Sequence, residues 1–231
     1  MIGIAERDAH TLGTTYCTLL FIGADGRILG RHRKLKPTDL ERTVWGEGDG
    51  ASLRTYQRPY GLIGGLNCWE HVMMLPGYAL IAQGIQIHVS SWPSPGALEL
   101  SQARGLLLTQ ALSFHGCCYA IAVAGIMNPE NMLEQFRDPA LERPKIARGS
   151  CIIDPSASLL AEAPGEEEAI IIAQGSLETI RKCKTNRDIA GHYSRPDVLQ
   201  LMVNRQKLER AVFSDPGEAT AESALNAGSD E

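Results

Sequence analysis

The stretch YGLIGGLNCWEH, residues 60–71, changes character at Cys68. Before Cys68 it is apolar and glycine-rich, which is typical of a buried strand that turns sharply and lets another backbone approach closely. After Cys68 it becomes polar, and residues 70–83 are predicted to form a helix. A thiol at such a junction lies near first-turn N–H groups and the positive end of the helix dipole, which both favour the thiolate. The stretch therefore predicts a nucleophilic cysteine.

Burial statistics favour a different interpretation of Cys68. Most cysteines in apolar surroundings are small core residues, and this alternative has a prior of about two in three. The polar residues packed around Cys68, which are Asn67, Glu70 and His71, argue against it because a reactive thiol needs polar neighbours. The choice between the two interpretations depends on partners elsewhere in the chain.

Length and composition favour one domain. The chain has 231 residues, 44% of them hydrophobic, and a formal net charge of −5, so it can bury one substantial core. Residues 213–231 contain acidic residues but no Lys or Arg, and they are predicted to form a disordered tail behind a domain of residues 1–212. The mild acidity argues against a dedicated nucleic-acid binder.

Cysteine spacing and hydropathy narrow the function classes further. The six cysteines show neither a C-x-x-C pair nor metal-type spacing with histidine, so we expect no disulfide scaffold, no metal site and no cofactor. No apolar run approaches the roughly 18 residues of a membrane span, and no secretory signal follows Met1. The expected location is the cytoplasm, without a membrane partner.

Strand-like and helix-like segments alternate along the chain. Residues 15–22 and 27–30, joined by the turn GADG, predict a β-hairpin. Further strands are expected at 85–92, 118–126, 150–154, 158–162 and 169–173, and helices at 97–115 and 176–184. This alternation argues for a layered α/β architecture with the strands in the middle.

Six motifs occur in an order that characterises one family. Residues 32–38 read HRKLKPT, residues 41–50 read ERTVWGEGDG and residues 64–71 read GGLNCWEH. They are followed by QIHV at 86–89, GSCIIDP at 149–155 and GHYSRPDV at 191–198. The series covers residues 1 to about 204 and resembles the nitrilases, a branch of the carbon–nitrogen hydrolase superfamily.

This resemblance implies a four-layer α-β-β-α sandwich and a catalytic Glu-Lys-Cys triad. The nucleophile maps to Cys68 and the lysine to Lys34, which together with the backbone N–H of Trp69 would stabilise charge on the former nitrile nitrogen. Glu41 matches a second acidic residue near the lysine; alternatively it is a loop carboxylate paired with Arg42. The implied enzyme hydrolyses a small-molecule nitrile to a carboxylic acid and ammonia through a thioimidate and a thioester.

Other residues compete for these roles. Without the resemblance, Lys34 would be interpreted as a solvated charge in a basic loop, and Lys36 is its competitor, but only Lys34 holds the family position. His71 lies about one helical turn after Cys68, yet the family mechanism gives that position no catalytic role. His192 is expected to be structural.

The triad's glutamate ordinarily lies well before the lysine, in a part that this chain is expected to lack, and Glu6 does not match it. Three explanations stay open: a fragment or misassigned start at Met1, an inactive remnant, or a rewired enzyme in which Glu41 transfers the proton. General acid–base assistance contributes about 10²–10⁴-fold in rate. The alternative function class is therefore a non-catalytic, self-associating module, since family members commonly form homo-oligomers.

The substrate is less defined than the chemistry. Relatives that degrade cyanide and relatives that prefer arylacetonitriles share these motifs. The motifs therefore do not choose between aliphatic nitriles, aromatic nitriles, arylacetonitriles and cyanide, and an amide-hydrolysing relative is a further alternative.

Overall fold

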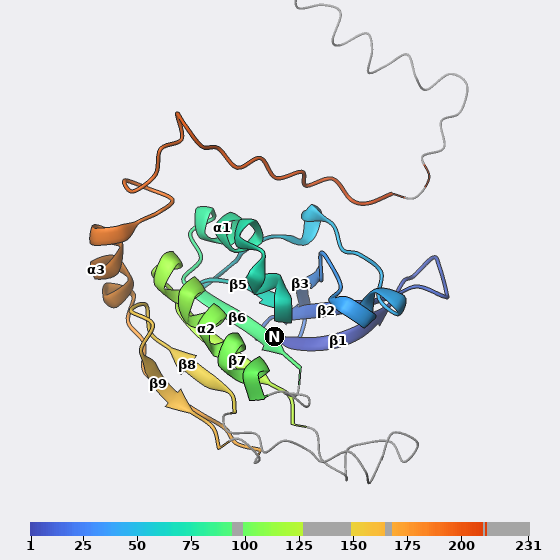
Figure 1. Cartoon of the computed structure of the whole chain (residues 1–231), viewed down its shortest axis with the longest axis horizontal. Helices are drawn as coiled ribbons and strands as arrows, with labels where there is room; N and C mark the ends of the chain where they lie inside the picture. The colour runs from blue at the N-terminus through green and yellow to red at the C-terminus, as the bar shows by residue number, and fades with distance from the viewer. Residues whose placement is uncertain (94–98, 127–148, 165–167, 210, 212–231) are drawn as a thin grey trace, which may run out of the picture.

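Figure 1 shows a computed structural model of the chain, in which residues 1–93, 99–126, 149–164, 168–209 and 211 are described. The predicted tail of residues 213–231 lies outside these ranges. Within them, no helix has the length and apolarity that crossing a membrane requires.

The first sheet has three antiparallel strands in the order β1-β2-β3. They are β1 (Ile2–Arg7), β2 (Thr15–Ile22) and β3 (Ile28–Arg33). The predicted hairpin is confirmed, with Phe21 opposite Gly30 and Gly26 in the turn at a φ of 78°, which glycine adopts without strain. Its second strand runs on to Arg33, which places the next residue, Lys34, directly after a strand.

The second sheet has six strands in the order β4-β5-β6-β7-β8-β9. They are β4 (Tyr56–Arg58), β5 (Gly61–Asn67), β6 (Ile87–Trp92), β7 (Tyr119–Ala124), β8 (Cys151–Ile153) and β9 (Leu159–Glu162). The central strands β5, β6 and β7 are parallel, and the outer pairs are antiparallel. The strands predicted at 85–92, 118–126, 150–154 and 158–162 are therefore present.

The strand predicted at 169–173 is wrong. These residues form no strand, and the side chains of Ile170 and Ile172 are 94% and 83% exposed. Alternating apolar residues form a strand only where a neighbouring strand pairs with them and a core face takes up their side chains. The described structure gives this segment neither.

Within the described ranges, three α-helices accompany the sheets: α1 (Met74–Ala82), α2 (Glu99–Gly116) and α3 (Leu177–Arg187). Single turns of 3-10 helix lie at η1 (Asp39–Thr43), η2 (Gly50–Ser52) and η3 (Cys68–Val72). The helices predicted at 97–115 and 176–184 are confirmed, with shifted ends.

The helix predicted at 70–83 is wrong in its first part. The chain forms η3, then passes through Met73 in an extended conformation, and only then begins α1. Pro76 is the reason, because a proline has no N–H to donate and clashes with the preceding turn. An α-helix can begin just ahead of Pro76, but it cannot run through it from Glu70.

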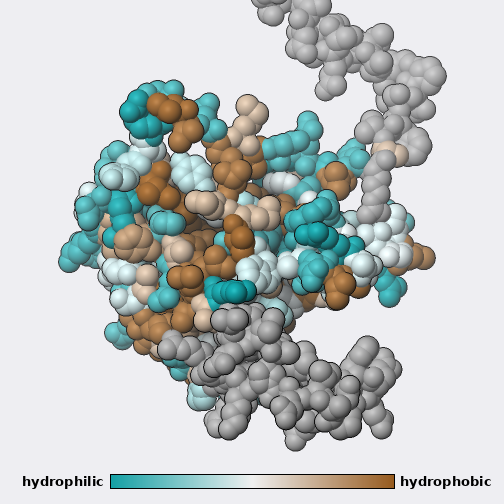
Figure 2. Space-filling view, viewed as in Figure 1, coloured by the Kyte–Doolittle hydropathy of each residue, from teal (hydrophilic) through white to brown (hydrophobic). Residues whose placement is uncertain are grey.

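Strand β5 lies at the centre of the packing. Leu66 on one face packs with Leu80 of α1 and Leu112 of α2, while Ile63 on the other face packs with Leu19 and other residues of the three-stranded sheet. The described residues thus form the α-β-β part of the expected α-β-β-α sandwich. Figure 2 shows hydrophobic side chains gathered on the face that carries α1 and α2.

The double glycine of β5 has a packing reason. A Cβ at Gly65 would lie 2.5 Å from the carbonyl oxygen of Val89 and 2.7 Å from Cδ2 of Leu19. Any side chain there would separate β5 from β6 and from the three-stranded sheet. The glycine therefore sets how closely the two sheets approach beneath Cys68.

Candidate active site

Cys68 occupies a strained turn between strand and helix. It follows the last residue of β5 and begins η3, so the junction predicted from the sequence is present. Its φ of 48° lies in the left-handed region, where a residue with a side chain costs about 1–3 kcal/mol. A nucleophile held in such a turn projects from the end of the sheet.

Burial controls the protonation of Cys68. Its side chain is 7% exposed, and desolvation raises the pKa of the thiol, more than the charge of Lys34 and the backbone N–H of Trp69 lower it. Glu41 and Glu70 raise the pKa further. The first-turn N–H of Trp69 thus acts in the predicted direction, but the net shift of the pKa favours the thiol because the desolvation cost is larger.

Lys34 is a buried cation. Its side chain is 1% exposed, so the solvated-loop interpretation is wrong. The Nζ atom donates to Oε2 of Glu41 at 2.6 Å, and the same oxygen accepts the Thr38 N–H at 2.8 Å. Glu41 therefore pairs with Lys34, while Arg42 donates to the carbonyl oxygen of Pro37.

The competing lysine lies at the surface. Lys36 has a half-exposed side chain and pairs with Glu47. Of the lysine charges, that of Lys34 lowers the pKa of Cys68 the most. The structure brings Cys68, Lys34, Glu41 and Trp69 into one neighbourhood.

Glu70 links the lysine segment to the cysteine segment. Its Oε1 accepts the N–H of Leu35 at 2.8 Å, and its Oε2 accepts the N–H of Asn67 at 2.8 Å. Nε2 of His32 lies 3.0 and 3.1 Å from the two oxygens. Because these backbone groups adjoin Lys34 and Cys68, Glu70 sets the spacing between the two candidate catalytic residues.

The charge of Glu70 is stabilised by its partners. Burial raises the pKa of this carboxyl, but His32 and the backbone N–H groups of Leu35 and Asn67 lower it more, so the net pKa is below its ordinary value. Sequence reasoning assigned Glu70 no role. The available signal was its spacing from Asn67, since a carboxylate three residues after a helix-capping residue bonds back to that residue's N–H.

The His71 side chain contacts the backbone of Cys68. Its Nδ1 is 2.7 Å from the carbonyl oxygen of Cys68, and burial lowers its pKa to about 4. A neutral His71 is unsuited to supply positive charge beside the thiol. The expectation that it is no catalytic acid or base is consistent with this environment.

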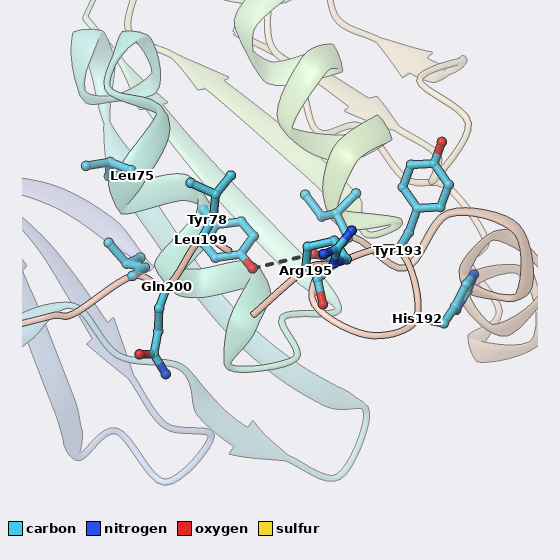
Figure 3. Close-up of a pocket in the computed structure, with 10 residues that line it drawn as sticks. Leu75, Tyr78, His192, Tyr193, Arg195, Leu199 and Gln200 are labelled. Carbon is cyan, nitrogen blue, oxygen red and sulfur yellow. Dashed lines mark hydrogen bonds between the residues drawn. The ribbon is translucent and has the colours of Figure 1, made fainter. Parts of the chain in front are cut away.

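A cavity of about 790 Å³ lies elsewhere, between α1 and residues 189–201 (Figure 3). Leu75 and Tyr78 of α1 line it together with His192 and Arg195, and the guanidinium of Arg195 pairs with Asp197 at 2.7 Å. None of the candidate catalytic residues lines this cavity. Its volume alone therefore does not identify the site of chemistry.

The sequence predicts no metal or cofactor ligands. Across the described ranges, no group of three or more His, Cys, Asp and Glu side chains is arranged to hold a metal ion.

Comparison with known proteins places this geometry in a family. The profile of the family described as carbon-nitrogen hydrolase matches residues 1–185. Nitrilase 2 from an unknown prokaryotic organism is 45% identical over 215 residues, which are 93% of this chain and 66% of the relative. The aliphatic nitrilase of Rhodococcus rhodochrous is 39% identical over 215 residues, 89% of this chain and 58% of the relative.

A solved structure has the same fold. Nit3 of Saccharomyces cerevisiae, a member of branch 10 of the nitrilase superfamily, matches with a TM-score of 0.65 and 20% identity, over 80% of this chain and 61% of that chain. The chain spans 58–66% of the length of the two nitrilases above. It belongs to the carbon-nitrogen hydrolase family, in the nitrilase branch.

Proposed function

We propose that this protein is a nitrilase that hydrolyses a nitrile to a carboxylic acid and ammonia, with Cys68 as its nucleophile. One observation carries the proposal. A buried cation, Lys34, is held by Glu41 beside a cysteine in a strained strand-to-helix turn. The similarity to nitrilases supports the choice of a nitrile over other carbon–nitrogen bonds.

The reaction proceeds through two covalent intermediates. The Cys68 sulfur adds to the nitrile carbon and the nitrogen takes up a proton, which gives a thioimidate. Water adds to this carbon, and ammonia leaves, which gives a thioester. A second water releases the carboxylic acid and restores the thiol. One nitrile and two waters thus yield one acid and one ammonia.

Negative charge develops beside Cys68 in each addition step. The Nζ of Lys34 and the N–H of Trp69 would stabilise it, first on nitrogen and then on oxygen. Both groups already act on the sulfur, since each lowers the pKa of Cys68. Because Lys34 is buried and held by Glu41, its charge needs little reorganisation when the anion forms.

The nucleophile must lose a proton before it attacks, because burial raises its pKa. Two described carboxylates, Glu41 and Glu70, lie within electrostatic range of Cys68. Both oxygens of Glu70 are occupied, by Leu35, Asn67 and His32, whereas Lys34 and Thr38 both bond to the same oxygen of Glu41, Oε2. Among the described residues we therefore assign proton transfer to Glu41, in addition to its role of holding Lys34.

Ammonia release tests the proposal. The full gene product is incubated with an aliphatic nitrile, an aromatic nitrile, an arylacetonitrile, cyanide and the corresponding amides. We expect ammonia from at least one nitrile, none after Cys68→Ala, and about 10²–10³-fold less after Lys34→Met. Cys183→Ala, a cysteine variant on α3, should keep full activity. Ammonia from the Cys68→Ala variant, or from amides alone, overturns the assignment.

We also propose that copies of the chain associate. Val72, Met74 and Leu75 are half-exposed or more, and contiguous apolar side chains at a surface favour an interface. Light scattering after size-exclusion chromatography is expected to give a mass above that of one chain, and a monomer at micromolar concentration contradicts this. The cytoplasmic location stays a prediction, to be tested by cell fractionation.

A further inference from the structure

Three buried polar side chains lie behind Cys68 and take no part in the proposed reaction. They are His71 of η3 and His88 and Ser90 of β6. The Nε2 of His71 is 2.9 Å from Nε2 of His88 and 2.9 Å from Oγ of Ser90. The ring of His71 also stacks on Trp92, with ring centroids 5.0 Å apart. This cluster holds the His71 ring in one orientation.

Hydrogen-bond chemistry sets the tautomer of His71. The carbonyl oxygen of Cys68, 2.7 Å from Nδ1, can only accept, so Nδ1 carries the hydrogen. Burial lowers the pKa of both His71 and His88, so both rings are neutral at pH 7 and Nε2 of His71 is an acceptor. Nε2–H of His88 and the hydroxyl of Ser90 are both within reach as donors, and the single lone pair of Nε2 accepts from one of them at a time. The bonds therefore run in one direction, toward the Cys68 carbonyl.

That carbonyl shares a peptide unit with the candidate anion-stabilising N–H. The C=O of Cys68 and the N–H of Trp69 belong to one planar group, so a bond that fixes the oxygen also fixes the direction of the N–H. A donor on the oxygen polarises the unit and strengthens its N–H as a donor. The left-handed φ of Cys68 makes this orientation strained, so it needs to be held.

We infer that His71 is a positioning residue that holds and polarises the Cys68–Trp69 peptide, so that the Trp69 N–H points at the reacting sulfur and at the anion formed from the substrate. His88 and Ser90 support it by fixing its tautomer. The first half of the inference is that the Trp69 N–H points at the Cys68 sulfur, and it can be tested without turnover. The second half is that the same N–H stabilises the anion formed from the substrate, and it rests on the proposed function.

Site-resolved alkylation by iodoacetamide tests the first half. The rate at Cys68 is followed by mass spectrometry of its peptide as a function of pH, in the full chain. Three variants separate the two ring nitrogens: His71→Asn keeps a donor at the Nδ1 position, His71→Gln places its amide at the Nε2 position, and His71→Leu removes both. The charged groups that face Cys68 are Lys34, Glu41 and Glu70, and they are the same in every variant.

We expect the Leu and Gln variants to alkylate Cys68 about tenfold more slowly at pH 7.5, with the rate profile displaced to higher pH, because one hydrogen bond to the thiolate is weakened. The Asn variant should stay within about threefold of the native rate. His115→Leu, which removes an exposed histidine at the end of α2, is the matched control and should match the native chain. Equal profiles for native, Asn and Gln chains overturn the inference.

Folding is monitored in the same experiment. Cys118 is fully buried, so its alkylation reports unfolding. If His71→Leu exposes Cys118, the Asn and Gln pair decides: a slow Gln variant with a native-like Asn variant supports the inference, and two equal rates refute it.

Turnover distinguishes the inference from the proposed function. In an active chain, His71→Gln should lower kcat and leave KM nearly unchanged, because the interaction acts on the anion rather than on the bound nitrile. A chain that hydrolyses no nitrile but shows the expected alkylation pattern refutes the proposed function and supports the role of His71. A chain that hydrolyses nitriles, but whose Cys68 alkylation rate does not change in the His71 variants, supports the proposed function and refutes the role of His71.

Discussion

Replacing Glu70 by glutamine tests the link between the segments that carry the two candidate catalytic residues, Lys34 and Cys68. The carboxylate is 1% exposed and accepts the N–H of Leu35 and the N–H of Asn67, each at 2.8 Å, through different oxygens. Glutamine keeps the size of the side chain, but one of its two terminal groups donates instead of accepting. Whichever way the amide turns, one buried backbone N–H loses its acceptor and His32 loses a charged partner.

The expected loss of stability follows from these contacts. A buried donor without an acceptor costs about 1–3 kcal/mol, and losing a hydrogen bond to a charged group, here the one from His32 to the carboxylate, costs about 1.5–3 kcal/mol. The effects overlap because they share one side chain, so we expect the free energy of unfolding to fall by about 3–5 kcal/mol. For a chain of this length that corresponds to a melting temperature lower by on the order of 10 °C.

Thermal and urea unfolding followed by circular dichroism measure the effect. Glu178→Gln is the matched control, since this carboxylate is exposed and pairs with Arg181 at the surface; its effect should be below about 1 kcal/mol. The Glu70→Gln chain should also alkylate Cys68 at a different rate, because the spacing to Lys34 is released. A melting temperature within about 2 °C of the native chain would refute the reasoning.

The pH dependence gives a second check with a definite sign. The net pKa of Glu70 is below its ordinary value of 4.5, so the folded chain binds this proton less readily than the unfolded chain. Its stabilising contribution is complete above pH 4.5 and is lost as the pH falls through the folded-state pKa. The difference in stability between the native and Glu70→Gln chains should therefore shrink below pH 4.5.

Three further predictions follow from buried contacts. Gly48→Ala should destabilise the chain by about 2–4 kcal/mol in urea unfolding, because a Cβ at this position would lie 2.2 Å from the carbonyl oxygen of Arg33. Gly13→Ala is the control, because the space around Gly13 is open. Equal losses of stability in the two variants would contradict the prediction. Burial keeps His88 neutral when folded, with a pKa well below 6.5, so only the unfolded chain gains a proton as the pH falls below 6.5 and stability decreases. His88→Asn should flatten that slope by up to about 1.4 kcal/mol per pH unit in urea melts at pH 7, 6 and 5, and an unchanged slope argues against a neutral His88. Lys34→Met should move the alkylation profile of Cys68 to higher pH, since Lys34 lowers the pKa of that thiol; a profile that stays in place would remove Lys34 from the site.

The local sequence pattern was sufficient to predict the strands around the candidate site, but it gave a wrong prediction in two segments. The hairpin and β5 were predictable, because their turn residues and apolar runs act within a few positions. The start of helix α1 was not predicted correctly, because the effect of Pro76 reaches back across Met73 and prevents a helix from Glu70. The conformation of residues 169–173 was not predicted correctly either, because a strand depends on a partner that the local residues do not specify.

Motifs predicted the residues of the candidate site but not their states. Cys68 was predicted from its local setting, and Lys34 from its position in the motif series of the family. Whether Lys34 is solvated or buried, and whether Cys68 is a thiol or a thiolate, depends on how much protein covers them. Desolvation is a sum over neighbours from many segments, and it acted against the effect expected from the helix terminus.

The amino-acid sequence alone was enough to identify a nitrilase-like chain and its α/β layers, and to propose Cys68 as its nucleophile, because these depend on residue types at short spacings and on the order of motifs. Folding was needed to bring Glu70 to the N–H groups beside Lys34 and Cys68, and to place His71 between β6 and the Cys68 carbonyl. The physical reason is that hydrogen bonds and desolvation act over a few ångströms in space. Leu35 and Glu70 lie 35 positions apart along the chain, and His71 and His88 lie 17 positions apart, where no local pattern relates them.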